Sequence, residues 1–288
     1  KSNNYLVSIF EENNLFGLSY VDITTGEFAT TQLNSSKIHS EISRLNPSEV
    51  LIQEKTVNNL DLSTFKTTEI SKDYYSLPHS IEEIKNYFKI KSLEPFGCEN
   101  LPLAIQASGS ILKYVKRNRK NSIVPVTKLT TYSAENFMIL DKQTSNNLEI
   151  FRGGRDNNQK HSLLSVLDST KTPMGARMLK RWLGQPLLNI DQLEKRLDSV
   201  ESLFQNTQIR SKSIQILNSI SDIERIINNI SIGNTNPREV FTLANSLEQC
   251  EKVQKEINKD QKIYQKLSWI MKKLSNNTKI INIIKSAI

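Results

Sequence analysis

The apolar residues of this chain change their spacing near its middle, and this change limits the possible folds more than any other feature. Up to about residue 134, short β-rich runs alternate with turn signals and a few helical patterns. From about residue 135 onward, apolar residues recur every three or four positions, which is the period of amphipathic helices. A length of 288 residues also exceeds the usual size of one domain. We therefore predict an α/β domain followed by an all-α domain.

The α/β domain is predicted to begin with an antiparallel meander. Its three strands are separated by short turn signals and cover residues 5–10, 15–21 and 27–33. A helical pattern over residues 38–45 stops before Pro47, because a residue before proline avoids the helical region. Residues 50–52 return as a fourth strand. This order indicates helices packed on a mixed sheet and resembles the ribonuclease H topology.

Two further helices complete this domain, at residues 80–88 and 101–119. Ser80 and Glu83 have the spacing of a capping box, so we expect the first of these helices to begin at Ser80. Residues 55–80 are polar and weakly patterned, and a threonine-rich stretch follows the second helix. The predicted limits are residues 1–120 for the α/β domain, 121–134 for the linker and 135–288 for an elongated helical domain.

The helical domain is predicted to contain strongly amphipathic helices. Met178, Leu179 and Trp182 share one stripe of a helix, and together with Met174 they are expected in the core. Residues 189–204 form another helix with a broad apolar surface.

Start signals in the last third predict longer helices. Ser221 has the spacing of a capping box, and Asn236 followed by Pro237 is a stronger signal. The second helix can extend to Ile257, and the same pattern resumes over residues 263–274. Helices of this length usually pack against partners or act as levers between distant sites. We expect a stiff helical strut.

The net charge of +8 is concentrated in the second half. Residues 1–134 carry 15 Lys and Arg against 14 Asp and Glu, whereas residues 135–288 carry 23 against 16. An excess of +7 there is consistent with a nearby polyanion or with a lysine-rich proteome. In the first half, the end of the 101–119 helix gives candidates for proximity to DNA: Lys116, Arg117, Arg119 and Lys120. A solvated helix end explains the same residues, since cations also favour a helix C-terminus.

Cysteine content and hydropathy indicate the compartment. Cys98 and Cys250 lie far apart, which argues for a reducing cytosol over a disulfide framework. No stretch approaches the roughly 18 apolar residues of a membrane span. We expect a cytoplasmic protein without a membrane partner.

The usual signatures of catalytic and cofactor sites are missing from the sequence. Gly153-Gly154 is the only glycine pair, and no Gly-Lys-Ser/Thr follows it as a phosphate loop requires. The three histidines are isolated, and no nucleophile elbow is present. A two-metal nuclease needs carboxylates on the central strands, yet residues 5–10 contain none, and Asp22 and Glu27 suit exposed turn roles. We therefore expect no catalytic, cofactor-binding or metal-binding residue in this chain.

Several segments resemble the bacterial MutS DNA mismatch repair family, in that family's order. The most specific is Thr-Lys-Thr-Pro-Met-Gly-Ala-Arg-Met-Leu-Lys-Arg-Trp-Leu at residues 170–183. The other similar segments are residues 17–28, 45–51, 140–149, 163–168, 222–225, 230–233 and 237–240. His161 departs from the family's usual small residue. The resemblance extends over nearly the whole chain and implies an internal fragment with a connector domain and part of the core and lever domain.

The resemblance also implies a mode of action. Members of the family bind mismatched double-stranded DNA as homodimers, use ATP with magnesium, and recruit MutL. The fragment is then a structural coupling region without enzymatic activity of its own, between a mismatch-binding domain and a DNA-dependent ATPase domain that lie outside it. Glu82 and Glu83 are candidates for contact with MutL. Arg177, Lys180 and Arg181 are expected to be solvated or paired with inter-domain carboxylates.

Two alternatives to the coupling region remain open. The basic second half and the run Lys113–Lys120 also suit a stand-alone nucleic-acid-binding module. The ribonuclease H-like order of elements leaves a nuclease to be tested, with Asp22 as the residue to replace.

Overall fold

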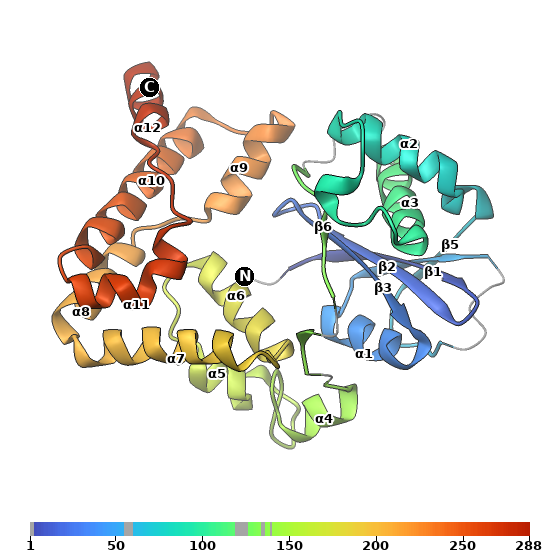
Figure 1. Ribbon diagram of the computed structural model, residues 1–288, viewed down its shortest axis with the longest axis horizontal. Helices are drawn as coiled ribbons and strands as arrows, with labels where there is room; N and C mark the ends of the chain where they lie inside the picture. Colours follow the sequence, from blue (N-terminus) through green and yellow to red (C-terminus); the bar gives the residue numbers. More distant parts are fainter. Residues whose placement is uncertain (1–2, 55–59, 119–125, 134–135, 139) are drawn as a thin grey trace.

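Six strands form one mixed sheet in the N-terminal part of the computed structural model (Figure 1), which describes residues 3–54, 60–118, 126–133, 136–138 and 140–288. The sheet order is β5-β4-β1-β2-β3-β6. The strands are β1 (Tyr5–Glu12), β2 (Leu15–Asp22), β3 (Glu27–Asn34), β4 (Glu49–Gln53), β5 (Thr67–Ile70) and β6 (Thr130–Thr131). The first three are antiparallel, and β4, β5 and β6 join in parallel. The four predicted strands are confirmed, and β5 and β6 are additions.

Turn chemistry sets the register of the meander. Asn13 and Asn14 both have positive φ, at 52° and 61°, which suits the tight connection between β1 and β2. Gly26 has φ 75° and donates its backbone N–H to the carbonyl of Asp22, closing the turn between β2 and β3. Both turns therefore form where asparagine and glycine permit left-handed backbone.

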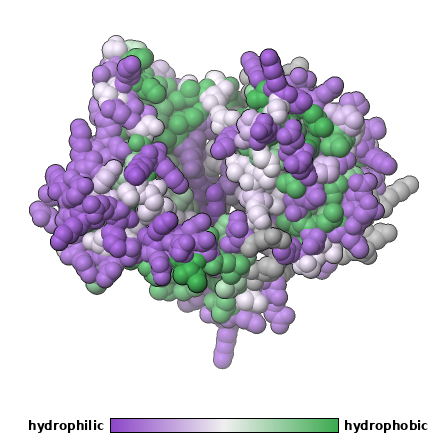
Figure 2. Space-filling model, viewed as in Figure 1, coloured by the Kyte–Doolittle hydropathy of each residue, from purple (hydrophilic) through white to green (hydrophobic). Residues whose placement is uncertain are grey.

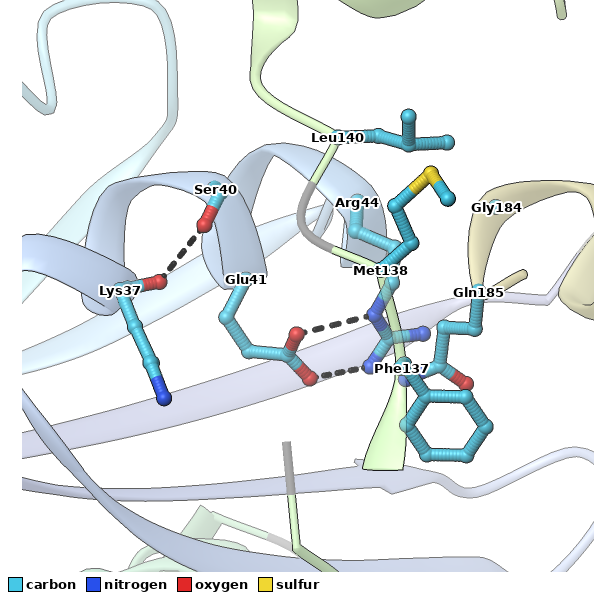
Figure 3. Close-up of a pocket in the computed structure, with 9 residues that line it drawn as sticks. All are labelled: Lys37, Ser40, Glu41, Arg44, Phe137, Met138, Leu140, Gly184 and Gln185. Carbon is cyan, nitrogen blue, oxygen red and sulfur yellow. Dashed lines mark hydrogen bonds and ion pairs between the residues drawn. The ribbon is translucent and has the colours of Figure 1, made fainter. Parts of the chain in front are cut away.

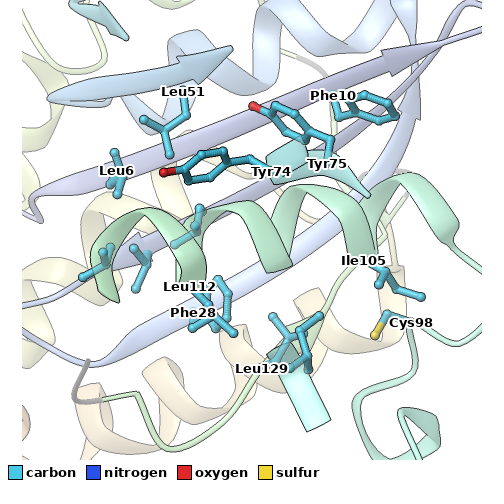
Figure 4. Packing of buried hydrophobic residues seen from close by; sticks show 14 of the residues in the cluster. Leu6, Phe10, Phe28, Leu51, Tyr74, Tyr75, Cys98, Ile105, Leu112 and Leu129 are labelled. Carbon is cyan, nitrogen blue, oxygen red and sulfur yellow. The ribbon is translucent and has the colours of Figure 1, made fainter. Parts of the chain in front are cut away.

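Helices cover both faces of the sheet. On one face, α1 (Ser35–Leu45) buries Ile38, Ile42 and Leu45, as predicted. On the other, α3 (Pro102–Asn118) packs directly on the strands (Figure 4). The helix α2 (Leu77–Phe88) packs against α3. Glycine at position 17 allows this packing, because a Cβ atom there would lie 2.0 Å from the carbonyl oxygen of Leu103. Two short 3₁₀ helices, η1 (Lys72–Tyr75) and η2 (Glu94–Phe96), complete this layer.

The predicted start of α2 is wrong by three residues. The helix begins at Leu77, with Ser76 at the N-cap and Pro78 in the first turn, where the missing N–H of proline has no cost. Ser80 is therefore inside the helix and is buried against Gly109 of α3. A capping box at Ser80 does not form.

The C-terminal part is helical, and no named strand occurs in the residues after 135 that the structure describes. Its helices are α4 (Lys142–Asn147), α5 (Leu163–Leu167), α6 (Pro173–Gly184), α7 (Ile190–Gln205), α8 (Thr207–Leu217), α9 (Ile223–Ile232), α10 (Pro237–Ile257), α11 (Gln261–Met271) and α12 (Thr278–Ala287), with a 3₁₀ turn η4 (Gln159–His161). The two parts lie side by side (Figure 1), and none of the described helices is long and apolar enough to cross a membrane.

Helix starts in this part follow the side-chain caps. Asn236 accepts a hydrogen bond from the N–H of Glu239 at 2.9 Å, as predicted. At α9 the cap is Asp222, which accepts from the N–H of Arg225, so the predicted cap at Ser221 is wrong by one residue. The longest helix, α10, has 21 residues and ends at Ile257, where α11 turns back and packs in the same apolar cluster. The helical domain is thus a bundle in which α10 packs against α8, α9 and α12, and its role as a stiff strut stays a prediction.

Candidate inter-domain coupling site

The turn between β2 and β3, residues 22–27, is the point of the sheet that faces the helical part. The carboxylate of Asp22 accepts hydrogen bonds from the N–H and hydroxyl of Thr24, at 2.8 and 2.6 Å, and from the N–H of Asn4 at 3.2 Å. Asp22 is fully buried, so the expectation of an exposed residue is wrong, although its role in the turn is as expected. These bonds fix the 22–27 turn and connect it to residue 4, just before β1.

Glu27, at the end of this turn, collects hydrogen bonds from both parts of the chain. Its carboxylate accepts from the hydroxyl of Tyr5 at 3.0 Å and of Tyr20 at 3.2 Å. Arg181 of α6 donates to the same carboxylate at 2.7 Å. Burial and the charge of Glu27 raise the pKa of both tyrosines, which keeps their hydroxyls neutral donors. Glu27 is therefore an acceptor shared between the sheet and the helical part.

Arg181 forms an ion pair with a carboxylate of the other domain, which is one of the two arrangements expected for it from the sequence. Burial opposes its charged form, but Glu27 and the two tyrosines outweigh that effect and raise the pKa of the guanidinium. The ion pair joins positions 154 residues apart and connects α6 to the sheet.

A second helix contacts the same turn. Asn228 of α9 is buried and donates from its side-chain amide to the backbone carbonyl of Ile23 at 2.5 Å. Because a backbone carbonyl is the acceptor, this contact depends on the position of the turn and not on the side chain of residue 23. The 22–27 turn is thus bound at both of its ends, by α9 and by α6.

A buried arginine ties these two helices to each other. Arg177 of α6 has a side chain only 4 % exposed and donates to both oxygens of Asp222, at 2.8 and 2.7 Å. It also donates to the carboxylate of Glu224. The hydrogen bonds that Arg177 donates to Asp222 raise the pKa of the guanidinium in spite of burial. In return, Arg177 holds the pKa of Asp222 below its usual value, although burial alone would raise it. The segments 17–28, 170–183 and 222–225, which carry the resemblance, therefore meet at one place.

The other predicted residues of α6 lie differently from expectation. Met178 is 51 % exposed, so its assignment to the core is wrong for this structure. The buried face of α6 is formed by Ala176 and Arg177, because the ion pairs of Arg177 turn that side inward. Trp182 is half-buried, with the guanidinium of Arg196 3.6 Å from its ring centre. Lys180 lies over Phe151, at 5.8 Å from the ring centre, and burial lowers the pKa of its ammonium.

A second, smaller junction lies beside α1 (Figure 3). Arg44 and Glu41 form a two-point ion pair, and Tyr132 donates its hydroxyl to Glu41 at 2.6 Å. Across from them lie Phe137 and Gln185, the latter just after α6, and the cavity between has a volume of about 30 Å³. That volume has room for a small number of water molecules.

The predicted partner-binding residues lie away from these junctions, on α2 and α3. Glu83 and Lys116 form an ion pair with each other at 2.9 Å, and Arg117 donates to the hydroxyl of Tyr74 at 2.9 Å. Glu82 is exposed. Two of the predicted DNA-proximal cations, Arg119 and Lys120, lie outside the described residues. The structure thus pairs a residue expected to contact MutL with one expected to lie near DNA, and contact with either partner stays a prediction.

Residues 5–10 of β1, where a two-metal nuclease would need a carboxylate, contain no acidic residue. Ser8 in the middle of β1 is fully buried, 3.1 Å from the hydroxyl of Tyr75 and 2.7 Å from that of Ser110. Within the described part of the chain, no group of three or more His, Cys, Asp or Glu residues could hold a metal ion. What the described residues assemble is a junction of ion pairs and hydrogen bonds between the sheet and the helical part.

Comparisons with known proteins divide the chain into the same two parts as its fold does. Residues 4–130 match the family model of MutS domain II, and residues 143–287 match that of MutS domain III. The chain is 39 % identical over 249 residues to the DNA mismatch repair protein MutS of Dehalococcoides mccartyi, which covers 86 % of this chain and 29 % of that protein. It is 36 % identical over 280 residues to the DNA mismatch repair protein MutS of Caldanaerobacter subterraneus subsp. tengcongensis. This match covers 93 % of this chain and 32 % of that protein.

A third relative gives the same result. The DNA mismatch repair protein MutS of Synechocystis is 40 % identical over 263 residues, covering 86 % of this chain and 30 % of that protein. The chain spans about a third of the length of the relatives that it matches. With connector and core domains matched in order over most of its length, the chain belongs to the MutS family of DNA mismatch repair proteins.

Proposed function

We propose that this chain is the coupling region of a DNA mismatch repair ATPase, in which it transmits movement between a mismatch-binding part and an ATPase part. Its relatives carry the name DNA mismatch repair protein, and the chain corresponds to their second and third domains. On this proposal the chemistry belongs to other domains. ATP with magnesium, mismatched double-stranded DNA, MutL and a second copy of the protein are ligands and partners of the whole polypeptide.

One observation carries the proposal: a single turn of the sheet is bound by two helices that are also bound to each other. Arg181 and Asn228 hold the 22–27 turn, and Arg177 fixes α6 to α9 through buried ion pairs. Coupling between distant sites needs contiguous packed elements that move together. A displacement of α6 and α9 would carry the connector sheet with it.

The test uses the full-length polypeptide that carries this region and a duplex with one mispair. The variants are Glu27→Gln, Arg181→Gln and the double variant. Glutamine at position 27 keeps an acceptor for Tyr5 and Tyr20 but removes the charge that faces Arg181. We expect each single variant to bind the mispair without nucleotide as the parent does, and to lose release from the mispair on addition of ATP and Mg²⁺. The double variant should be no worse than either single one, because both remove the same interaction.

A matched control is the surface ion pair between Glu83 and Lys116, whose 2.9 Å separation is similar. Glu83→Gln and Lys116→Gln should leave ATP-induced release unchanged. Normal release in the Glu27 and Arg181 variants would contradict the proposal, as would additive losses in the double variant.

A further inference from the structure

Three tyrosine rings form a continuous row on the face of the sheet that α1 covers. The ring centre of Tyr20, in β2, lies 4.9 Å from that of Tyr5 and 6.0 Å from that of Tyr132, and both contacts are edge to face. Aromatic pairs in this geometry attract each other beyond the area that they bury. We call these three residues the tyrosine row. It connects β1, β2 and the residue that follows β6.

The hydroxyls of the tyrosine row bind a carboxylate at each of its ends. Those of Tyr5 and Tyr20 donate to Glu27, the carboxylate that also receives α6. At the other end, Tyr132 donates to Glu41 of α1 at 2.6 Å. The row therefore lies between the contact beside the 22–27 turn and the contact beside α1.

The middle tyrosine is within electrostatic reach of both ion pairs. Burial and the charge of Glu27 raise the pKa of Tyr20. The guanidinium groups of Arg44 and Arg181 both oppose that rise, although Arg44 belongs to α1 and Arg181 to α6. Basic side chains from both domains thus act on one hydroxyl, and the two contacts are parts of a single network.

The segment that joins the two parts, residues 132–138, also ends at α6. Its first residue, Tyr132, belongs to the network. At its other end, the N–H of Met138 donates to the carbonyl of Pro186 at 2.8 Å, just after α6. Figure 3 shows Met138 and Phe137 between α1 and the end of α6. Arg181 lies in the last turn of the same helix, so the end of α6 is attached to the sheet by a side chain and by the joining segment.

We propose that Tyr132 is a positioning residue for the coupling between the domains: it fixes the start of the joining segment in the network that receives Arg181. The inference rests on the proposed function and adds a second route to it. Figure 2 shows the surface hollowed between the two parts, which leaves room for them to turn about the segment that joins them. A start held by Glu41 opposes that turn, so that a shift of α6 reaches the sheet through Arg181 and through the joining segment together.

The test follows exchange of the Met138 amide hydrogen, because its bond to Pro186 requires the joining segment to lie on the end of α6. Full-length polypeptide and its Tyr132→Phe, Arg181→Gln and double variants are compared without nucleotide by hydrogen exchange and mass spectrometry. Phenylalanine keeps the ring beside Tyr20 and removes only the hydroxyl. We expect exchange in peptides that contain Met138 to be about tenfold faster in each single variant, since each loses a hydrogen bond to a charged group.

The double variant tests whether the network joins the two residues. Tyr132 and Arg181 share no contact among those that the structure describes, so their effects would multiply if they acted independently. We expect exchange in the double variant to be no faster than in the faster single variant. A product of the two single effects would overturn the proposal.

Tyr114→Phe is the matched control, because that hydroxyl also donates to a carboxylate of the sheet, Glu49 at 2.8 Å, and lies outside the network. It should leave exchange at Met138 unchanged. Exchange at the centre of β1 and β2 should stay unchanged in every variant. Faster exchange throughout the sheet of Tyr132→Phe would overturn the proposal, because Tyr132 would then only stabilise its own domain.

Release from a mispair on addition of ATP and Mg²⁺ is measured on the same variants. We expect Tyr132→Phe to lose it in part and Tyr114→Phe to keep it. Unchanged exchange at Met138 in Tyr132→Phe would overturn the positioning role, as would normal release from the mispair by that variant while Arg181→Gln loses release. Normal release by both variants would contradict the proposed function itself, whatever the exchange rates are.

Discussion

The guanidinium of Arg181 lies 2.7 Å from the carboxylate of Glu27, and the two side chains differ in their other hydrogen-bond partners. Arg181 is 44 % exposed, whereas Glu27 is 20 % exposed and also accepts the hydroxyls of Tyr5 and Tyr20. The carboxylate of Glu27 thus stabilises both the sheet and its contact with α6, whereas Arg181 stabilises only that contact. Substitutions at the two ends of one ion pair should therefore have unequal effects.

Glu27→Ala should destabilise the chain more than Arg181→Ala. Removal of the carboxylate leaves two mostly buried tyrosine hydroxyls without their acceptor, which costs about 1–3 kcal/mol. Removal of a half-exposed arginine costs up to about 1 kcal/mol. Urea unfolding of the two variants and the parent measures the difference. Equal losses would mean that the tyrosines do not depend on Glu27.

Arg177→Ala should be among the most destabilising single changes in the core domain. Breaking a buried ion pair by removal of one partner costs about 3–5 kcal/mol, because the remaining charge, here the mostly buried carboxylate of Asp222, stays without a partner. Asp222→Ala should cost more than Glu224→Ala, since Asp222 also caps α9 and Glu224 is 51 % exposed. Chemical denaturation of the three variants checks this order. A larger loss for Glu224→Ala would contradict the bidentate assignment.

Much of this architecture follows from local sequence signals. The asparagine pair at 13 and 14 and Gly26 define the meander, and Asn236 before Pro237 starts α10 where expected. These features depend on backbone conformation and capping, which neighbouring residues determine. The helical character of the second domain follows from a different local signal, the recurrence of apolar residues every three or four positions.

The junction could not be predicted in the same way, because its partners are far apart in sequence. Asn228 had no signal, since its acceptor is a backbone carbonyl about 200 positions earlier. Arg177 and Arg181 were noted as possible partners of carboxylates, but periodicity cannot say which carboxylate faces which arginine. The misplaced Met178 has the same origin, because a helical stripe shows which residues share a face and not which face is covered.

The chain should lose stability in alkaline solution through its buried tyrosines. Burial, with Glu41 beside it, raises the pKa of Tyr132 well above its usual 10. The unfolded chain therefore loses this proton first, so the contribution is complete below about pH 10 and declines as the pH rises above it, by about 1.4 kcal/mol per pH unit. Comparison of the free energy of unfolding of Tyr132→Phe and the parent between pH 9 and 11.5 or so isolates this slope. Parallel curves would show that Tyr132 ionises as freely in the folded chain as in the unfolded one.

The isolated chain should bind DNA only weakly, although its net charge is +8. The described cations at the end of α3 are engaged within the fold: Lys116 pairs with Glu83, and Arg117 bonds Tyr74. Contacts to phosphates would compete with these partners, and binding driven by phosphate contacts alone weakens steeply with salt. We expect a gel shift with a 30-base-pair or so duplex at low salt that disappears by ~150 mM, with no change in the Lys116→Gln variant. Glu83→Gln is the informative companion, because it removes the carboxylate that pairs with Lys116 and so frees that ammonium for contact with a phosphate. Tight binding at ~150 mM salt that Lys116→Gln or Arg117→Gln abolishes would instead favour a stand-alone nucleic-acid-binding module.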